Sequence, residues 1–286
     1  MINKYKDIES KINQIVELLE DKKDTQEYKG LYKGIATLLS PLVEKPDILF
    51  LGINSGSGAW AEKNPTGTTN ITPLRMINED EYFLSNNDWF KENTARGSWG
   101  VGKANEAYEW YQRDKPINNI FPVRMIDLLY NIAEKKYPQA KISYKTPPFW
   151  TEDIKSKIMY TNLYPIITDN TNTLRKVHKQ LSMESSLKGL WHTSKKRTSI
   201  WDVQKYFIEN TRELVNLVKP KIIVCMGSQA YNDFTYTNNP KTSKIFETTD
   251  NGIPVIGFSR RGNWSSSIPD LSDMICKEIC QKKGKK

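Results

Sequence analysis

Two asparagines stand at the ends of apolar segments and are the first candidates for chemistry. Asn54 follows the run DILFLGI and opens the turn NSGSG, and Asn162 ends the run KIMYTNL. A side-chain amide carries both a donor and an acceptor, so it can orient a water molecule without being a strong base, or pair with the edge of a planar ligand. Each asparagine also has a purely structural interpretation, because asparagine tolerates left-handed turns and caps loops.

A basic and aromatic cluster follows the last apolar run of the chain. The segment SRRGNW contains Ser259, Arg260, Arg261 and Trp264. Hydroxyl and guanidinium groups bind phosphate, and an indole ring can stack on an exposed base. The segment KKRTSIW, residues 195–201, has a similar composition. A solvated turn is the alternative for both segments, since runs of like charge are most often solvated.

Four short apolar runs predict the strands that would hold these residues. The runs cover residues 47–53, 157–163, 221–226 and 253–258, and helical patterns cover residues 8–19, 28–39, 123–135, 203–218, 228–234 and 272–280. Strands that alternate with helices indicate an α/β fold, so we expect a central, mostly parallel four-stranded sheet in a three-layer α/β/α arrangement. The carboxyl ends of such strands form the usual ligand site, where Asn54, Asn162 and Ser259 would converge.

The segment between the first two predicted strands has a different composition. Residues 60–156 are rich in aromatic side chains and show no clear strand pattern. Because long structureless loops are rare in compact domains, we expect this segment to be a helical insertion over the strand ends. The whole chain, residues 1–286, is predicted to be one domain, and the sequence KKGKK at 282–286 is predicted to be a basic tail.

Composition excludes several classes of protein. The 286 residues include 42 Lys and Arg against 33 Asp and Glu, a formal charge of +9, and 38% are hydrophobic. This predicts a folded core rather than a disordered chain. The positive charge suggests a polyanionic partner, with ordinary solubility as the alternative. No apolar run reaches the roughly 18 residues of a membrane span. Three cysteines and two histidines predict neither a disulfide framework nor a metal centre. We therefore expect a cytoplasmic protein without membrane contact, metal or cofactor.

The four apolar runs, together with the turns that follow them, resemble the uracil-DNA glycosylase superfamily. The segments are DILFLGINSGSG, MYTNLYP, PKIIVCMGSQAYNDF and VIGFSRRGNW, in the order in which that family has them. The first turn of the family reads Gly-x-(Asp/Asn)-Pro-(Tyr/Gly). Residues Gly52–Gly56, GINSG, are closest to the branches with GINPG or GMNPG. The aromatic segment falls outside the resemblance.

The resemblance implies an activity and a site. Asn54 would hold the water that attacks the sugar, Asn162 would read the flipped base, and Trp60 or Phe83 would stack on that base. The implied DNA-contacting residues are Ser259, Arg260, Arg261 and Trp264. The implied protein is a monofunctional DNA glycosylase that acts as a monomer on duplex DNA with a flipped nucleotide.

Two departures from the family bear on the substrate. Uracil-specific members end the first turn with a tyrosine that blocks C5 of the base, and this chain has Gly56. The fourth motif of the family, His-Pro-Ser-Pro-Arg, aligns with Gly257–Arg261, so the histidine that would bind the base anion is missing. We predict excision of a modified pyrimidine, such as hydroxymethylated or glucosylated cytosine in phage DNA, as antiviral defence. The alternatives are a repair glycosylase for uracil or mismatched bases, a catalytically inactive DNA-binding homologue and a nucleoside hydrolase.

Overall fold

The structure is a computed structural model of the chain. It describes residues 1–32, 35, 37–38, 42–54, 61–63, 69–71, 120–138, 157–168, 170–191, 197–238, 245–260 and 264–281. Most of the predicted insertion at 60–156 and the tail at 282–286 lie outside these residues. Inside the insertion, β2 (Ala61–Lys63) and β3 (Thr69–Ile71) form an antiparallel pair that the sequence did not indicate.

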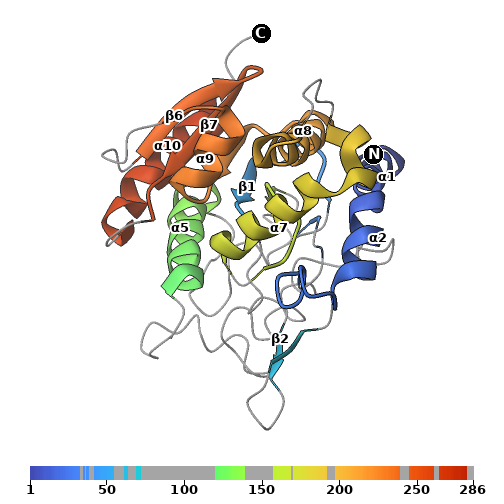
Figure 1. Cartoon of the computed structure of the whole chain (residues 1–286). Coiled ribbons are helices and arrows are strands. Elements are labelled where there is room, and N and C mark those ends of the chain that lie inside the picture. Colours follow the sequence, from blue (N-terminus) through green and yellow to red (C-terminus); the bar gives the residue numbers. More distant parts are fainter. Residues whose placement is uncertain are drawn as a thin grey trace.

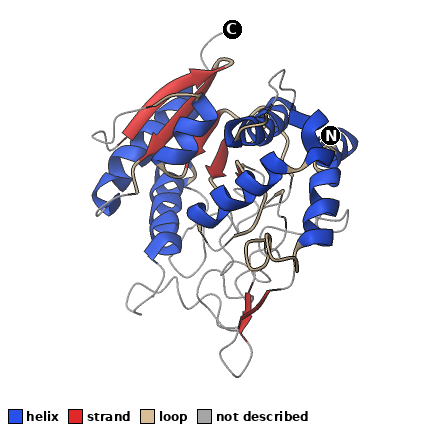
Figure 2. Ribbon diagram, in the orientation of Figure 1, coloured by secondary structure: helices blue, strands red, loops and turns tan. Residues whose placement is uncertain are grey.

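Five of the strands in the described residues form one sheet (Figures 1 and 2). These strands are β1 (Ile48–Gly52), β4 (Ile158–Asn162), β5 (Ile222–Cys225), β6 (Ile245–Asp250) and β7 (Ile253–Phe258). Their order across the sheet is β4-β1-β5-β7-β6, and β4, β1, β5 and β7 are parallel neighbours. These four are the predicted strands, so the α/β class and the mostly parallel sheet are confirmed.

The predicted number of four strands is wrong, because β6 adds a fifth at the edge. It pairs antiparallel with β7. Its sequence, IFETTD, buries one residue, Phe246, and exposes three others. Every residue of β1, β4 and β5 is buried, as is typical of parallel strands covered on both faces. β6 lacks that continuous apolar run, which is the feature by which the other strands were recognised.

Seven α-helices and two 3-10 helices occur in the described residues. They are α1 (Ile2–Ser10), α2 (Asn13–Lys22), α5 (Ile120–Lys136), α7 (Thr171–Met183), η6 (Ser185–Trp191), α8 (Ile200–Val218), α9 (Ser228–Thr235), η7 (Trp264–Ser267) and α10 (Ile268–Gln281). Five predicted helical segments are confirmed, the first of them as the two helices α1 and α2. The helix predicted over 28–39 is wrong in its described part, where Ile35 instead forms a β-bridge with Ile166. None of the described helices is long and apolar enough to cross a membrane.

Helix α7 was missed by the sequence analysis. Its buried residues, Leu174, Val177, His178 and Leu181, follow helical spacing, but three apolar residues in a polar segment are a weak signal. The Asn170 side chain caps the helix, because its Oδ1 accepts hydrogen bonds of 3.0 Å from the backbone N–H groups of residues 172 and 173. This cap fixes where the chain turns after β4.

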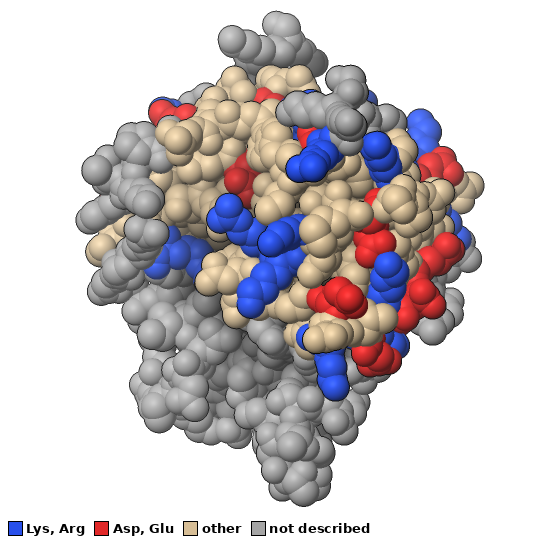
Figure 3. Space-filling view, in the orientation of Figure 1, with Lys and Arg blue, Asp and Glu red and all other residues tan. Residues whose placement is uncertain are grey.

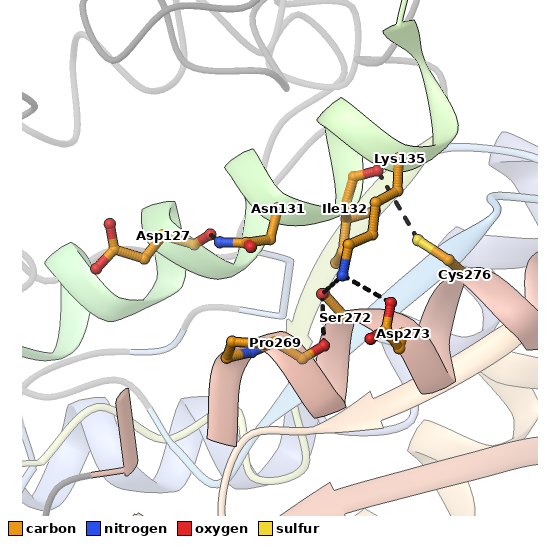
Figure 4. Close-up of polar contacts among 8 residues, drawn as sticks. All are labelled: Asp127, Asn131, Ile132, Lys135, Pro269, Ser272, Asp273 and Cys276. Carbon is orange, nitrogen blue, oxygen red and sulfur yellow. Dashed lines mark hydrogen bonds and ion pairs between the residues drawn. The ribbon is translucent and has the colours of Figure 1, made fainter. Parts of the chain in front are cut away.

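Helices pack against one another in two groups. Helix α7 packs against α8, which also contacts α1, and α5 packs against α10. Figure 4 shows polar contacts between α5 and α10. Lys135 Nζ donates a hydrogen bond to Ser272 Oγ and forms an ion pair with Asp273, both at 2.7 Å. Helix α9 lies against β5 and β7. Helix α10 also contacts β5.

Candidate functional site

The carboxyl ends of the four parallel strands lie at one edge of the sheet. Gly52 at the end of β1 is in register with Asn162 at the end of β4, and β5 and β7 continue the same parallel ladder. Asn54, Gly227 and Ser259 follow β1, β5 and β7 within two residues. The sheet therefore brings the predicted strand-end residues that the structure describes to one edge, in the order β4, β1, β5, β7.

Asn162 and Gly52 are packed against each other. A β-carbon added to Gly52 would collide with Oδ1 of Asn162 and would lie 3.4 Å from Cε of Met226. Asn162 is buried, with 5% of its surface exposed. The absence of a side chain at position 52 therefore makes the room in which the amide of Asn162 lies.

Replacing Gly52 with alanine is expected to lower the free energy of unfolding by about 1 to 3 kcal/mol, because the added methyl group overpacks the site and displaces Asn162. Urea unfolding of the parent and the variant measures the loss. Gly189→Ala is the control, since a β-carbon at Gly189 meets no atom within 4 Å. Its expected change stays within about 0.5 kcal/mol. Equal stability of Gly52→Ala and the parent would contradict the close approach.

The backbone that leads to Asn54 is held by the neighbouring chain. The parallel ladder continues beyond the strands, since the N–H of Leu163 donates to the carbonyl of Gly52 at 2.8 Å and the N–H of Tyr164 donates to that of Ile53 at 3.0 Å. These bonds fix the two residues before Asn54. Asn54 itself is half-buried.

The amide of Asn54 has a defined orientation. Its Nδ2 donates to Oγ1 of Thr168 at 2.9 Å, and that hydroxyl donates to the carbonyl of Asn170 at 2.9 Å. The hydroxyl of Thr168 has one hydrogen, which it donates to Asn170, so it can only accept a hydrogen bond from Asn54. The nitrogen of the Asn54 amide, and not its oxygen, must therefore face Thr168. The carbonyl oxygen Oδ1 of Asn54 therefore faces away from Thr168. Thr168 lies 114 residues from Asn54 and was not predicted from the sequence.

The ends of β5 and β7 meet through a glycine and an arginine. Gly227 is the N-cap of α9 and has a backbone φ of +129°, which residues other than glycine rarely adopt. A β-carbon there would lie 3.3 Å from Cδ of Arg260, so the arginine stem lies against this turn. Ser259 is half-buried and Arg260 is exposed. Trp264 begins η7. Arg261 and the other predicted base-binding residues, Gly56, Trp60 and Phe83, lie outside the described residues.

His178 lies in the core on α7. Its ring centroid lies 4.9 Å from that of Tyr164 and 5.7 Å from that of Phe207. Neither ring nitrogen has a hydrogen-bond partner in the described part of the chain. Burial lowers the pKa of His178 to about 3, so the imidazole is neutral at physiological pH. Packed between the rings of Tyr164 and Phe207, His178 is a residue of the core.

The buried histidine predicts a loss of stability in acid. A histidine in the unfolded chain has a pKa near 6.5. Below that pH the unfolded chain therefore binds a proton at His178, whereas the folded chain does not. The free energy of unfolding is unaffected by protonation of His178 above pH 6.5 and falls by about 1.4 kcal/mol per pH unit between pH 6.5 and pH 3. His178→Phe is expected to lack this loss. Its stability relative to the parent should rise by about 2 to 3 kcal/mol between pH 6.5 and pH 4.5 in urea unfolding. If the stabilities of the two proteins changed in parallel with pH, the assignment of this acid sensitivity to His178 would be wrong.

The comparisons with known proteins add no family. No family model and no curated protein matches this chain. Among the described residues, no three His, Cys, Asp or Glu side chains form a group that could hold a metal ion. The two amides of Asn54 and Asn162, on neighbouring strands, are the central feature of the strand ends.

Proposed function

We propose that the protein is a monofunctional DNA glycosylase that flips a modified pyrimidine out of duplex DNA and hydrolyses its N-glycosidic bond. The observation that carries the proposal is the pair of amides at the carboxyl ends of β1 and β4. Asn54 is oriented by Thr168, and Asn162 is packed over Gly52, its partner in register. Two fixed amides on adjacent strand ends suit a reaction that needs one group for the attacking water and one for the base.

In the proposed mechanism each amide has one task. The carbonyl oxygen of Asn54, which faces away from Thr168, accepts a hydrogen bond from a water and directs the water oxygen at C1′. A bond forms between that oxygen and C1′ while the C1′–N1 bond breaks, and its electron pair leaves with the base. The proton lost by the water neutralises the departing base. Asn162 binds the base edge through its donor and acceptor, which stabilises the charge on the base as it leaves.

We infer the substrate class from Gly56. Glycine at this position offers no side chain to exclude a substituent at C5 of a pyrimidine. Hydroxymethylated or glucosylated cytosine of phage DNA is therefore the proposed substrate, and antiviral defence is the proposed role. Extrusion of a nucleotide requires a few kcal/mol, which contacts to a large substituent would help to offset. Uracil repair is the alternative within the same chemistry.

The proposal includes a three-layer arrangement of the fold. Right-handed crossovers between parallel strands would put α7, α8 and α9 on one face of the sheet and α5 on the other, where α10 would lie beside α5. The packing of α7 on α8 and of α5 on α10 supports this arrangement. Both layers would then leave the carboxyl ends of the strands open to DNA.

Base release tests the proposal directly. The protein is incubated with duplexes that contain uracil, a thymine mismatch, 5-hydroxymethylcytosine or its glucosylated form, and alkali then cleaves the strand at each abasic site. Cleavage at a modified cytosine supports the proposed substrate, and cleavage at uracil alone supports the repair alternative. Binding of duplex without cleavage of any substrate indicates the inactive homologue and overturns the enzymatic proposal.

A further inference from the structure

Helix α7 exposes a row of positive charge. Its apolar side, which includes Leu174 and Val177, is buried, whereas Arg175, Lys176 and Lys179 are exposed. The helix contains no Asp or Glu. We call these three residues the α7 cationic row.

The charges of the row are not compensated within the described residues. None of its three members forms an ion pair there, although lysines elsewhere do, as in the pairs of Lys22 with Glu184 and of Lys135 with Asp273. Figure 3 shows Lys and Arg side chains gathered over α7, with most of the Asp and Glu side chains of this face nearer to α1 and α2. Like charges four residues apart on a helix repel each other, so a polyanion that binds the row would relieve this repulsion.

The row begins beside the strand ends. Asn170, which caps α7, accepts the hydrogen bond of Thr168, and Thr168 in turn binds Asn54. At a rise of about 1.5 Å per residue, Arg175 lies about 7 Å along the helix from the cap and Lys179 about 13 Å. One strand of duplex DNA carries a phosphate every ~3.4 Å of helix axis, so the row has the length to meet about two phosphates.

Nucleic acid fits this surface better than a membrane. Helices that bind membrane surfaces insert an apolar face into the lipid and keep the basic face in water. The apolar face of α7 is already buried in the core, where α7 packs on α8. The helix therefore has only charge to offer to a partner, and this suits a phosphate backbone.

We propose that the α7 cationic row binds the phosphate backbone of DNA next to the nucleotide that is processed at Asn54. This inference rests on the proposed function for the identity of the polyanion. The row binds and positions the duplex, and it carries no sequence preference because phosphates are the same in every sequence.

The test compares two triple variants of the full chain. Arg175→Gln with Lys176→Gln and Lys179→Gln removes the row, and glutamine keeps the helix propensity. The control replaces three other exposed lysines, Lys4, Lys29 and Lys277, with glutamine, so it removes the same net charge. Fluorescence anisotropy with an unmodified labelled duplex gives Kd as a function of salt. Loss of the row is expected to weaken binding about 10²-fold at 0.1 M salt and to lower the salt slope by about 2, whereas the control should weaken binding by less than about 3-fold.

Each outcome decides between the row and the proposed activity. If DNA binding is weakened equally in the two triple variants, the proposed binding by the α7 cationic row is wrong and only the net charge of the protein affects affinity. Loss of binding to phosphatidylserine vesicles, with DNA binding unchanged, overturns it in favour of a membrane. If the parent releases no base but the row variant alone loses DNA affinity, the glycosylase proposal fails and the row stands as a DNA-binding surface. If the parent binds no DNA, both fail.

Discussion

Asn54→Ala is expected to lower the single-turnover rate of base release by ~10²-fold or more while DNA affinity changes little. In the proposed mechanism the Asn54 amide contributes mainly to the transition state, where it holds the attacking water, and a lost preorganised polar group of this kind reduces rates to about that extent. Rates are measured with excess protein over modified duplex, and affinity by anisotropy. Asn238→Ala is the control, because Asn238 is exposed after α9.

Variants of Thr168 test whether base release depends on the orientation of the Asn54 amide and not only on its presence. Thr168→Val removes the acceptor of the Asn54 amide at nearly constant shape, so the rate should fall by about 10-fold with unchanged affinity. Thr168→Ser keeps the hydroxyl and should restore most of the rate. A merely structural role would lower stability in Val and Ser variants without this difference in rate. Full activity of Asn54→Ala would remove Asn54 from the mechanism.

Gly56→Tyr is expected to suppress release of glucosylated cytosine by ~10²-fold or more and to leave release of uracil within a few-fold. The tyrosine side chain would fill the space that a C5 substituent needs, whereas uracil has only hydrogen at C5. Steric exclusion by a wall discriminates strongly because the larger base cannot reach the productive position at all. Release rates from matched uracil and modified-cytosine duplexes give the ratio directly.

Side-chain size provides the control at this position. Gly56→Ala adds one methyl group and should shift the same ratio less than Gly56→Tyr does. A parent protein that releases uracil quickly and cleaves no C5-substituted base would contradict the substrate proposal. The glycosylase chemistry at Asn54 would then remain, with uracil repair as its role.

Prediction from sequence succeeded where the physical cause is local. A strand buried on both faces must be apolar throughout, so the runs that became β1, β4 and β5 were recognisable. It failed at β6 and α7. An edge strand needs few apolar residues, and α7 is mostly polar because its outer face is solvated. β6 is held by its pairing with β7 across the two-residue turn 251–252, and α7 is held by its packing against α8.

The sequence by itself determined the four parallel strands and the placement of Asn54, Asn162 and Ser259 at or within two residues of their carboxyl ends, because burial and turn formation leave a signature in adjacent residues. Only the tertiary structure decided that β4 and β1 are neighbours, that Asn162 lies over Gly52, and that Asn54 is oriented by Thr168. Each of these contacts joins segments more than a hundred residues apart in the sequence. Such contacts have no counterpart in the local pattern of apolar and polar residues.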